Sequence, residues 1–81
     1  MTPIEDPKLR GLLAADIETA RRAAKDRAQK AAQFRSMADI HAPGHTAHVF
    51  NLNQAADEDL LAAFFTLRAD LSQLALDAGG G

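Results

Sequence analysis

Three histidines within eight residues form the part of this sequence that comes closest to a chemical site. They are His41, His45 and His48, and Pro43-Gly44 lies between the first two. Imidazole is a common ligand of zinc and nickel, so three on one loop can converge on a metal ion. Clustered imidazoles also repel one another once protonated, below about pH 6.5, which would make the loop a pH sensor. A solvated or interface-packed loop is the competing interpretation, because no nearby cysteine or glutamate completes a known metal motif.

A basic stretch precedes this loop and suggests a second kind of site. Residues 19–36 carry a net charge of +5, whereas residues 37–81 carry −5. Part of the stretch alternates in sign every four residues, as in a surface ladder of ion pairs: Glu18, Arg22, Asp26 and Lys30. Arg21, Lys25 and Arg35 remain on one face and are the candidate contacts to nucleic acid. The net charge of −2 and the lack of an aromatic beside them favour another use, attraction to the acidic second half.

Residues for covalent or acid–base catalysis are scarce. The chain has no cysteine and no tyrosine, and its two serines, Ser36 and Ser72, fall in helical stretches. No serine, histidine and acid occur together as a nucleophile with its base, and no glycine-rich phosphate loop precedes a helix. We therefore expect no enzyme activity and no cofactor, with zinc or nickel at the three histidines as the exception to test.

The elements that position these residues are predicted to be helices. Alanine accounts for 18 of 81 residues, isoleucine and valine together for only four, and tryptophan is absent, which favours helix and excludes a sheet domain. Asp6-Pro7 is a typical helix start, and Pro43 ends the helix that follows. Small and apolar residues recur along that helix every three or four positions: Leu9, Leu13, Ile17, Ala20, Ala24, Ala28, Ala31, Phe34 and Ala38. Arg27 lies at the edge of this stripe, where its side chain can extend toward an acid of the second helix.

The second helix is expected to begin between Asn51 and Asn53, both good N-cap residues. Its most regular apolar pattern alternates spacings of four and three: Leu60, Phe64, Leu67, Leu71, Leu74 and Ala78. This heptad pattern predicts the face that packs on the first helix. We therefore expect one domain over 1–81, with helix one at about 7–39, a connection at 40–52, helix two at 53–78 and a disordered tail at 79–81.

An antiparallel two-helix hairpin is the simplest arrangement of these elements, and it leaves apolar surface uncovered. A second stripe on helix two, the start of helix one and the connection would remain open, and such strips usually mark interfaces. The predicted interface residues are Leu9, Leu12, Val49, Phe50, Leu61, Phe65 and Leu76. We therefore predict a homo-oligomer, most simply two hairpins that pair into a four-helix bundle.

These observations favour a small non-enzymatic interaction module over other classes. We expect an adaptor, inhibitor or regulatory subunit that self-associates and binds a protein partner. A nucleic-acid-binding regulator is the alternative, and a metal- or pH-responsive protein is the second alternative. The longest bulky apolar run, Leu60 to Phe65, is far shorter than the ~20 residues of a membrane span, so we expect a cytoplasmic protein with no membrane contact.

Overall fold

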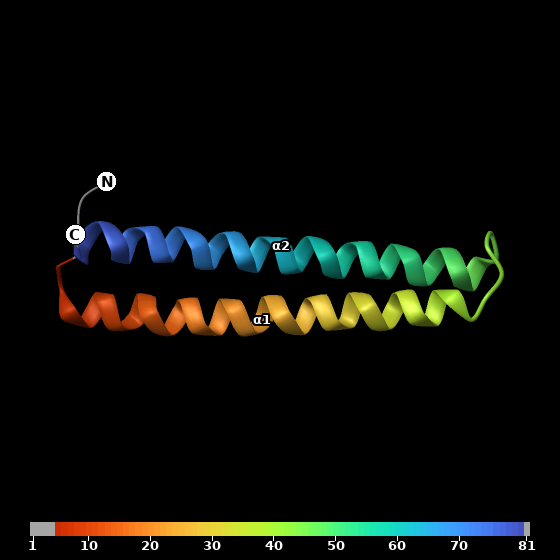
Figure 1. Ribbon diagram of the computed structural model, residues 1–81, viewed down its shortest axis with the longest axis horizontal. Coiled ribbons are helices and arrows are strands. Elements are labelled where there is room, and N and C mark those ends of the chain that lie inside the picture. Colours follow the sequence, from red (N-terminus) through yellow and green to blue (C-terminus); the bar gives the residue numbers. More distant parts are fainter. Residues whose placement is uncertain (1–4, 81) are drawn as a thin grey trace.

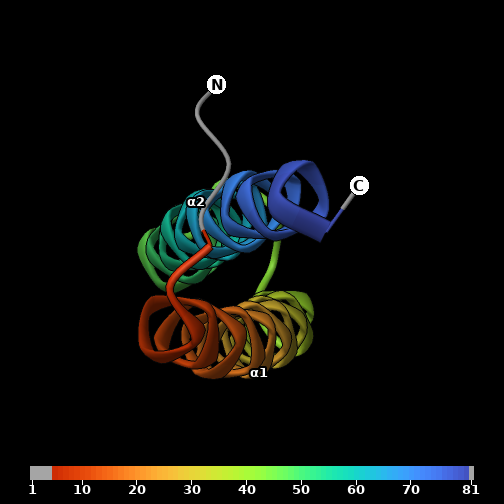
Figure 2. The same ribbon diagram turned by 90° about the vertical axis from the view of Figure 1, so that its left-hand side faces the viewer.

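The computed structural model is a hairpin of two long helices, and it describes residues 5–80 (Figure 1). Helix α1 spans Pro7–Asp39 and helix α2 spans Thr46–Gly80, with no strand in the described part. The two helices run antiparallel, side by side, over a length of 55 Å, and cross at a shallow angle when viewed end-on (Figure 2). The predicted all-α hairpin is confirmed. Within residues 5–80, neither helix contains a stretch apolar and long enough to cross a membrane.

Helix α1 starts where the sequence places its cap. Asp6 is extended, and its side-chain Oδ1 accepts a hydrogen bond from the backbone N–H of Lys8 at 2.9 Å. Pro7 occupies the first helical position, where its missing N–H has no partner to lose. The helix then continues for 33 residues to Asp39.

The turn between the helices is much shorter than the predicted connection at 40–52. The backbone N–H of His45 donates to the carbonyl of Ala42 at 3.0 Å, which closes a tight turn around Pro43 and Gly44. Gly44 has φ of +85°, a conformation that favours glycine, and proline followed by such a glycine is typical of a type II turn. Two residues later the chain is helical again, so α2 begins at Thr46 and not near Asn53.

His45 is the N-cap of α2, a role predicted for Asn51 or Asn53. Its Nδ1 accepts a hydrogen bond from the backbone N–H of Ala47 at 3.1 Å, and its carbonyl accepts the N–H of Val49. Asn51 lies inside α2, where it is buried and its side-chain amide donates to the carbonyl of Ala47. At the other end, α2 continues through Gly80, two residues beyond the expected end at Ala78. Gly81, the last residue of the predicted tail, lies outside the described residues.

The core is a seam of small side chains between the two helices. Among the residues whose burial the structure describes, six apolar ones are buried, and five of them are alanines: Ile17, Ala20, Ala31, Ala38, Ala55 and Ala69. Phe65 and Leu76 of α2 pack against the cluster of Ile17, Ala20 and Ala69. Alanine faces permit close approach of two helices, and they also leave the core thin, since no large side chain in the described part is fully enclosed.

The face of α2 that packs on α1 is the opposite of the predicted one. Buried and half-buried residues of α2 recur with spacings of four and three: Asn51, Ala55, Glu58, Ala62, Phe65, Ala69, Ser72 and Leu76. The predicted core stripe of Leu60, Phe64, Leu67, Leu71 and Leu74 points away and is exposed. At ~100° per residue the two stripes lie on nearly opposite sides of the helix.

Charged residues explain why α2 adopts this orientation. Arg27 lies in the α1 seam, and its Nη1 reaches Glu58 Oε2 at 3.2 Å, with only 14% of the Glu58 side chain exposed. Glu58 is in line with Ala55 and Ala62, so this pair forms only when the small-residue face of α2 meets α1. Turning the leucines inward would carry Glu58 away from α1 and break this half-buried pair.

Two further ion pairs flank the seam on opposite edges. Arg68 donates to Asp16 from both Nε, at 3.1 Å, and Nη2. The hydrogen bond and the nearby carboxylate raise the pKa of Arg68 above its ordinary value, so the guanidinium stays charged. On the other edge Arg21 reaches Asp70 at 3.3 Å. Exposed pairs of this kind contribute little stability each, but their positions agree with a single rotation of α2.

Candidate functional site

The three histidines serve the hairpin turn and do not converge. His45 caps α2, as described above, and its ring stacks on that of His41 with 5.4 Å between ring centroids and 12° between ring planes. His48 Nδ1 lies 2.8 Å from the carbonyl of Ala38; because a carbonyl only accepts, this nitrogen donates. His48 thereby satisfies a backbone acceptor at the end of α1.

The predicted metal site is therefore not assembled. Nδ1 of His45 and Nδ1 of His48 are both engaged in the hydrogen bonds that form the turn. Within residues 5–80, no three histidine, cysteine or acidic side chains are placed to hold one metal ion. The clustering of histidines in the sequence reflects the short turn, where each ring stacks, caps or donates to backbone.

The predicted nucleic-acid face is largely occupied by ion pairs to α2. Arg21 pairs with Asp70, and Arg35 pairs with Asp59. Two of the three side chains predicted to contact phosphate are therefore already in ion pairs with acids of α2. Lys25 is exposed on the same side of α1. Of the predicted surface ladder, the structure forms the pair of Arg22 with Glu18 at 3.1 Å. The arginines of the basic stretch of α1 thus mainly form ion pairs with the acidic second helix.

The predicted interface residues fall into two groups. Phe65 and Leu76 are half-buried and pack against the buried cluster of the hairpin, so they offer less open surface than predicted. Leu61 is partly exposed at the edge of α2, and Leu9 and Leu12 are exposed at the start of α1. The structure does not bring these leucines into one patch with the turn, which lies at the far end of the hairpin (Figure 1).

Val49 and Phe50 remain exposed at the turn end of the hairpin. Together with Gly44, Thr46 and Asn53 they line a shallow hollow of about 390 Å³. The hollow is mostly apolar in its lining residues and lies beside the His45 cap. This hollow at the turn is a surface on which another molecule can pack.

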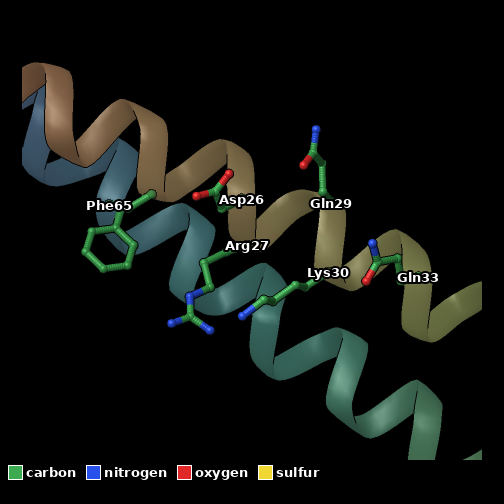
Figure 3. Close-up of a pocket in the computed structure, with 7 residues that line it drawn as sticks. Asp26, Arg27, Gln29, Lys30, Gln33 and Phe65 are labelled. Atoms are coloured by element: carbon green, nitrogen blue, oxygen red, sulfur yellow. The ribbon is translucent and has the colours of Figure 1, made fainter.

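A second hollow lies along the side of the hairpin, between α1 and Phe65 of α2 (Figure 3). Its volume is about 330 Å³, and its α1 side is polar apart from Ala23: Asp26, Arg27, Gln29, Lys30 and Gln33. Arg27 and Lys30 extend across α2, whereas Gln29 points away from it (Figure 3). Of the charged side chains in this hollow, Arg27 is held by its ion pair with Glu58.

The most prominent surface of the hairpin is the apolar row that was expected to be core. We call the outer stripe the five large side chains Leu60, Phe64, Leu67, Leu71 and Leu74. Each is between 54% and 71% exposed, although such side chains are usually buried. Phe64 contacts Phe65 edge-on, with 5.6 Å between ring centroids, which connects the outer stripe to the inner seam. No charged residue interrupts the row from Leu60 to Leu74 on this face.

The outer stripe is the surface feature whose position differs from the prediction. Its heptad spacing predicts a contact with α1, whereas the structure exposes it. Arg27 in the α1 seam is the residue that signals the other orientation, because its partner Glu58 belongs to the opposite stripe. Comparison of the chain with protein-family models, curated proteins and solved structures found no match.

Proposed function

We propose that this protein is a small, non-enzymatic interaction module that self-associates and binds a protein partner. The observation that carries the proposal is the outer stripe, an uninterrupted row of large apolar side chains on the side of α2 that faces away from α1. Contiguous exposed apolar surface of this kind usually marks a protein–protein interface. Its heptad spacing is the pattern by which helices pack on helices.

The division of residues between the two faces of α2 supports self-association. The fully buried residues of the inner seam are small, and no large side chain in the described part is fully buried there. The residues able to supply substantial hydrophobic stabilisation lie outside, where a lone hairpin leaves them in water. Association would complete the core that the hairpin lacks.

The hollow at the turn supports binding of a further protein. Val49 and Phe50 are exposed there. The hollow lies at the start of α2, whereas Leu67 and Leu71 lie in the second half of that helix. A short apolar segment of a partner fits a shallow hollow better than a charged ligand does, because no charged side chain lines it. This surface stays accessible when the outer stripe is covered from Leu60 to Leu74.

The test is molar mass in solution by light scattering, over a range of protein concentrations. We expect a mass above that of one 8.7 kDa chain, and a shift to the monomer in Leu67→Glu. Lys25→Glu is the control: it places the same acidic side chain on an exposed position of α1 and should leave the mass unchanged. A monomer at all concentrations would overturn the proposal.

The nucleic-acid alternative has less support than it had from the sequence, because Arg21 and Arg35 are paired with acids of α2. Fluorescence anisotropy with labelled RNA and DNA at low salt tests it directly. We expect no retention of either probe. Retention that is lost in Lys25→Glu would favour the alternative.

A further inference from the structure

The surface area of the hairpin indicates how much of it a partner should cover. The chain exposes 5602 Å², whereas a compact monomer of 8.7 kDa exposes about 4,700 Å². The excess of roughly 900 Å² is close to the ~800 Å² that each partner contributes to a standard protein interface. The hairpin is also thin, with extents of 55 × 19 × 14 Å, so a partner can lie along its whole length.

A second copy of this chain matches the outer stripe in both length and chemistry. From Leu60 to Leu74 the spacings are four, three, four and three, so reading the row backwards gives three, four, three and four. Two such rows therefore interlock when the helices run in opposite directions about an axis near Leu67, and every large side chain then meets another. The row carries no charge that would be left unpaired on burial.

Charges beyond the stripe distinguish the two possible directions. Asp57 lies in line with the outer stripe, seven residues before Phe64, and it is followed by Glu58 and Asp59. A parallel pair would bring Asp57 of both copies together within the contact, where like charges disfavour association. An antiparallel pair moves the two acidic segments to opposite ends of the assembly, about 27 Å apart along the axis at 1.5 Å per residue.

From these observations we infer that the occupant of the outer stripe is a second copy of the chain, packed antiparallel with α2 against α2 and with both α1 helices outside. The inference rests on the proposed self-association and adds its surface and direction. In this arrangement of four helices, the two α2 helices form the central pair. The alanine seam then serves to hold α1 against the outside of that pair.

Spin labels on two exposed alanines test the direction, and the chain's lack of cysteine makes single-site labelling possible. Ala56→Cys and Ala63→Cys lie seven residues apart on one edge of the outer stripe, so each is the matched control of the other. In the antiparallel dimer the axial distance between labels is about 12 Å at position 63 and about 33 Å at position 56. The difference of about 21 Å holds even if the axis lies a residue or two from Leu67.

Pulsed electron paramagnetic resonance on each labelled variant measures these distances, and dilution with unlabelled protein shows which couplings join two copies. Similar short distances at both positions would indicate a parallel pair and overturn the inference. Distances that are long at both positions, in a protein of dimeric mass, would place the contact on another surface and also overturn it. Neither result would affect the proposed self-association, which fails only if the mass is that of a monomer.

A second measurement links the direction to the stripe. Leu67→Glu should weaken self-association at least tenfold, because it places a charge at the centre of the contact. Leu12→Glu, an equally exposed leucine of α1, should change the dissociation constant less than twofold. The reverse order of effects would locate the contact at the start of α1 and overturn the inference.

Discussion

The two faces of α2 carry different kinds of residue and perform different tasks. The inner face combines three alanines and three polar residues, Glu58 among them, with only two large apolar side chains, whereas the outer face carries four leucines and a phenylalanine. The face with less apolar surface is the one that the chain buries against itself. Hydrophobic content alone therefore does not decide which stripe is core in a hairpin this small; here the buried stripe is the one whose Glu58 pairs with Arg27 of the opposing seam.

The largest expected effect lies at the inner face. Ala69 is fully buried against α1, so Ala69→Leu inserts three carbons into a contact with no free space. We expect a loss of about 1–3 kcal/mol in the free energy of unfolding from overpacking. Ala32→Leu, the same change at an exposed position of α1, should shift it by less than about 0.5 kcal/mol. Urea unfolding followed by circular dichroism measures both, and equal effects would show that the seam at Ala69 is not tightly packed.

At the outer face we expect the effect to depend on concentration. Leu67→Ala removes apolar surface that is exposed in the hairpin and covered in the associated protein. The free energy of unfolding should fall by about 1–2 kcal/mol per chain where the protein is associated, and should change by less than about 0.5 kcal/mol where it is dissociated. Thermal unfolding across a dilution series tests this. A loss that is the same at every concentration would place Leu67 inside the hairpin.

The pair of Arg27 and Glu58 is the feature that sets the rotation of α2. Glu58→Gln should cost about 1 kcal/mol, because the pair is only partly buried and the amide still accepts one hydrogen bond. Glu18→Gln, in the exposed pair with Arg22, should cost only a few tenths of a kcal/mol. The double variant Arg27→Glu with Glu58→Arg exchanges the two charges and should recover most of the lost free energy of unfolding. If it does not, the charge pair is not what orients the helix.

The smallest expected effect is at the turn. His45→Ala removes the side-chain acceptor that caps α2 and should cost about 0.5–1 kcal/mol, whereas His45→Asn keeps an acceptor and should cost almost nothing. Unfolding by urea compares the two variants. Equal destabilisation by both would show that the imidazole acts through its stacking on His41, and not as a cap.

Local patterns predicted much of the fold. Asp6 before Pro7, the alanine stripe of the first helix and the break at Pro43 were sufficient to place α1 and to predict a hairpin. The start of α2 was missed because asparagines are stronger capping residues than histidine, and the pattern does not show that Pro43-Gly44 completes the turn by itself. The three histidines are close along the chain, but the turn gives each a different place: His41 stacks on His45, His45 caps α2 and His48 bonds to Ala38.

The sequence by itself determined that this chain forms two helices, where the first begins, and that apolar residues on α2 form two stripes. Those properties depend on spacing and on local hydrogen bonds, which a linear pattern contains. Only the tertiary structure decided which stripe faces α1, because that choice balances burial of leucine against the need of Arg27 for an acid across the seam. It thereby also decided that Leu60, Phe64, Leu67, Leu71 and Leu74 remain on the surface, where another molecule can cover them.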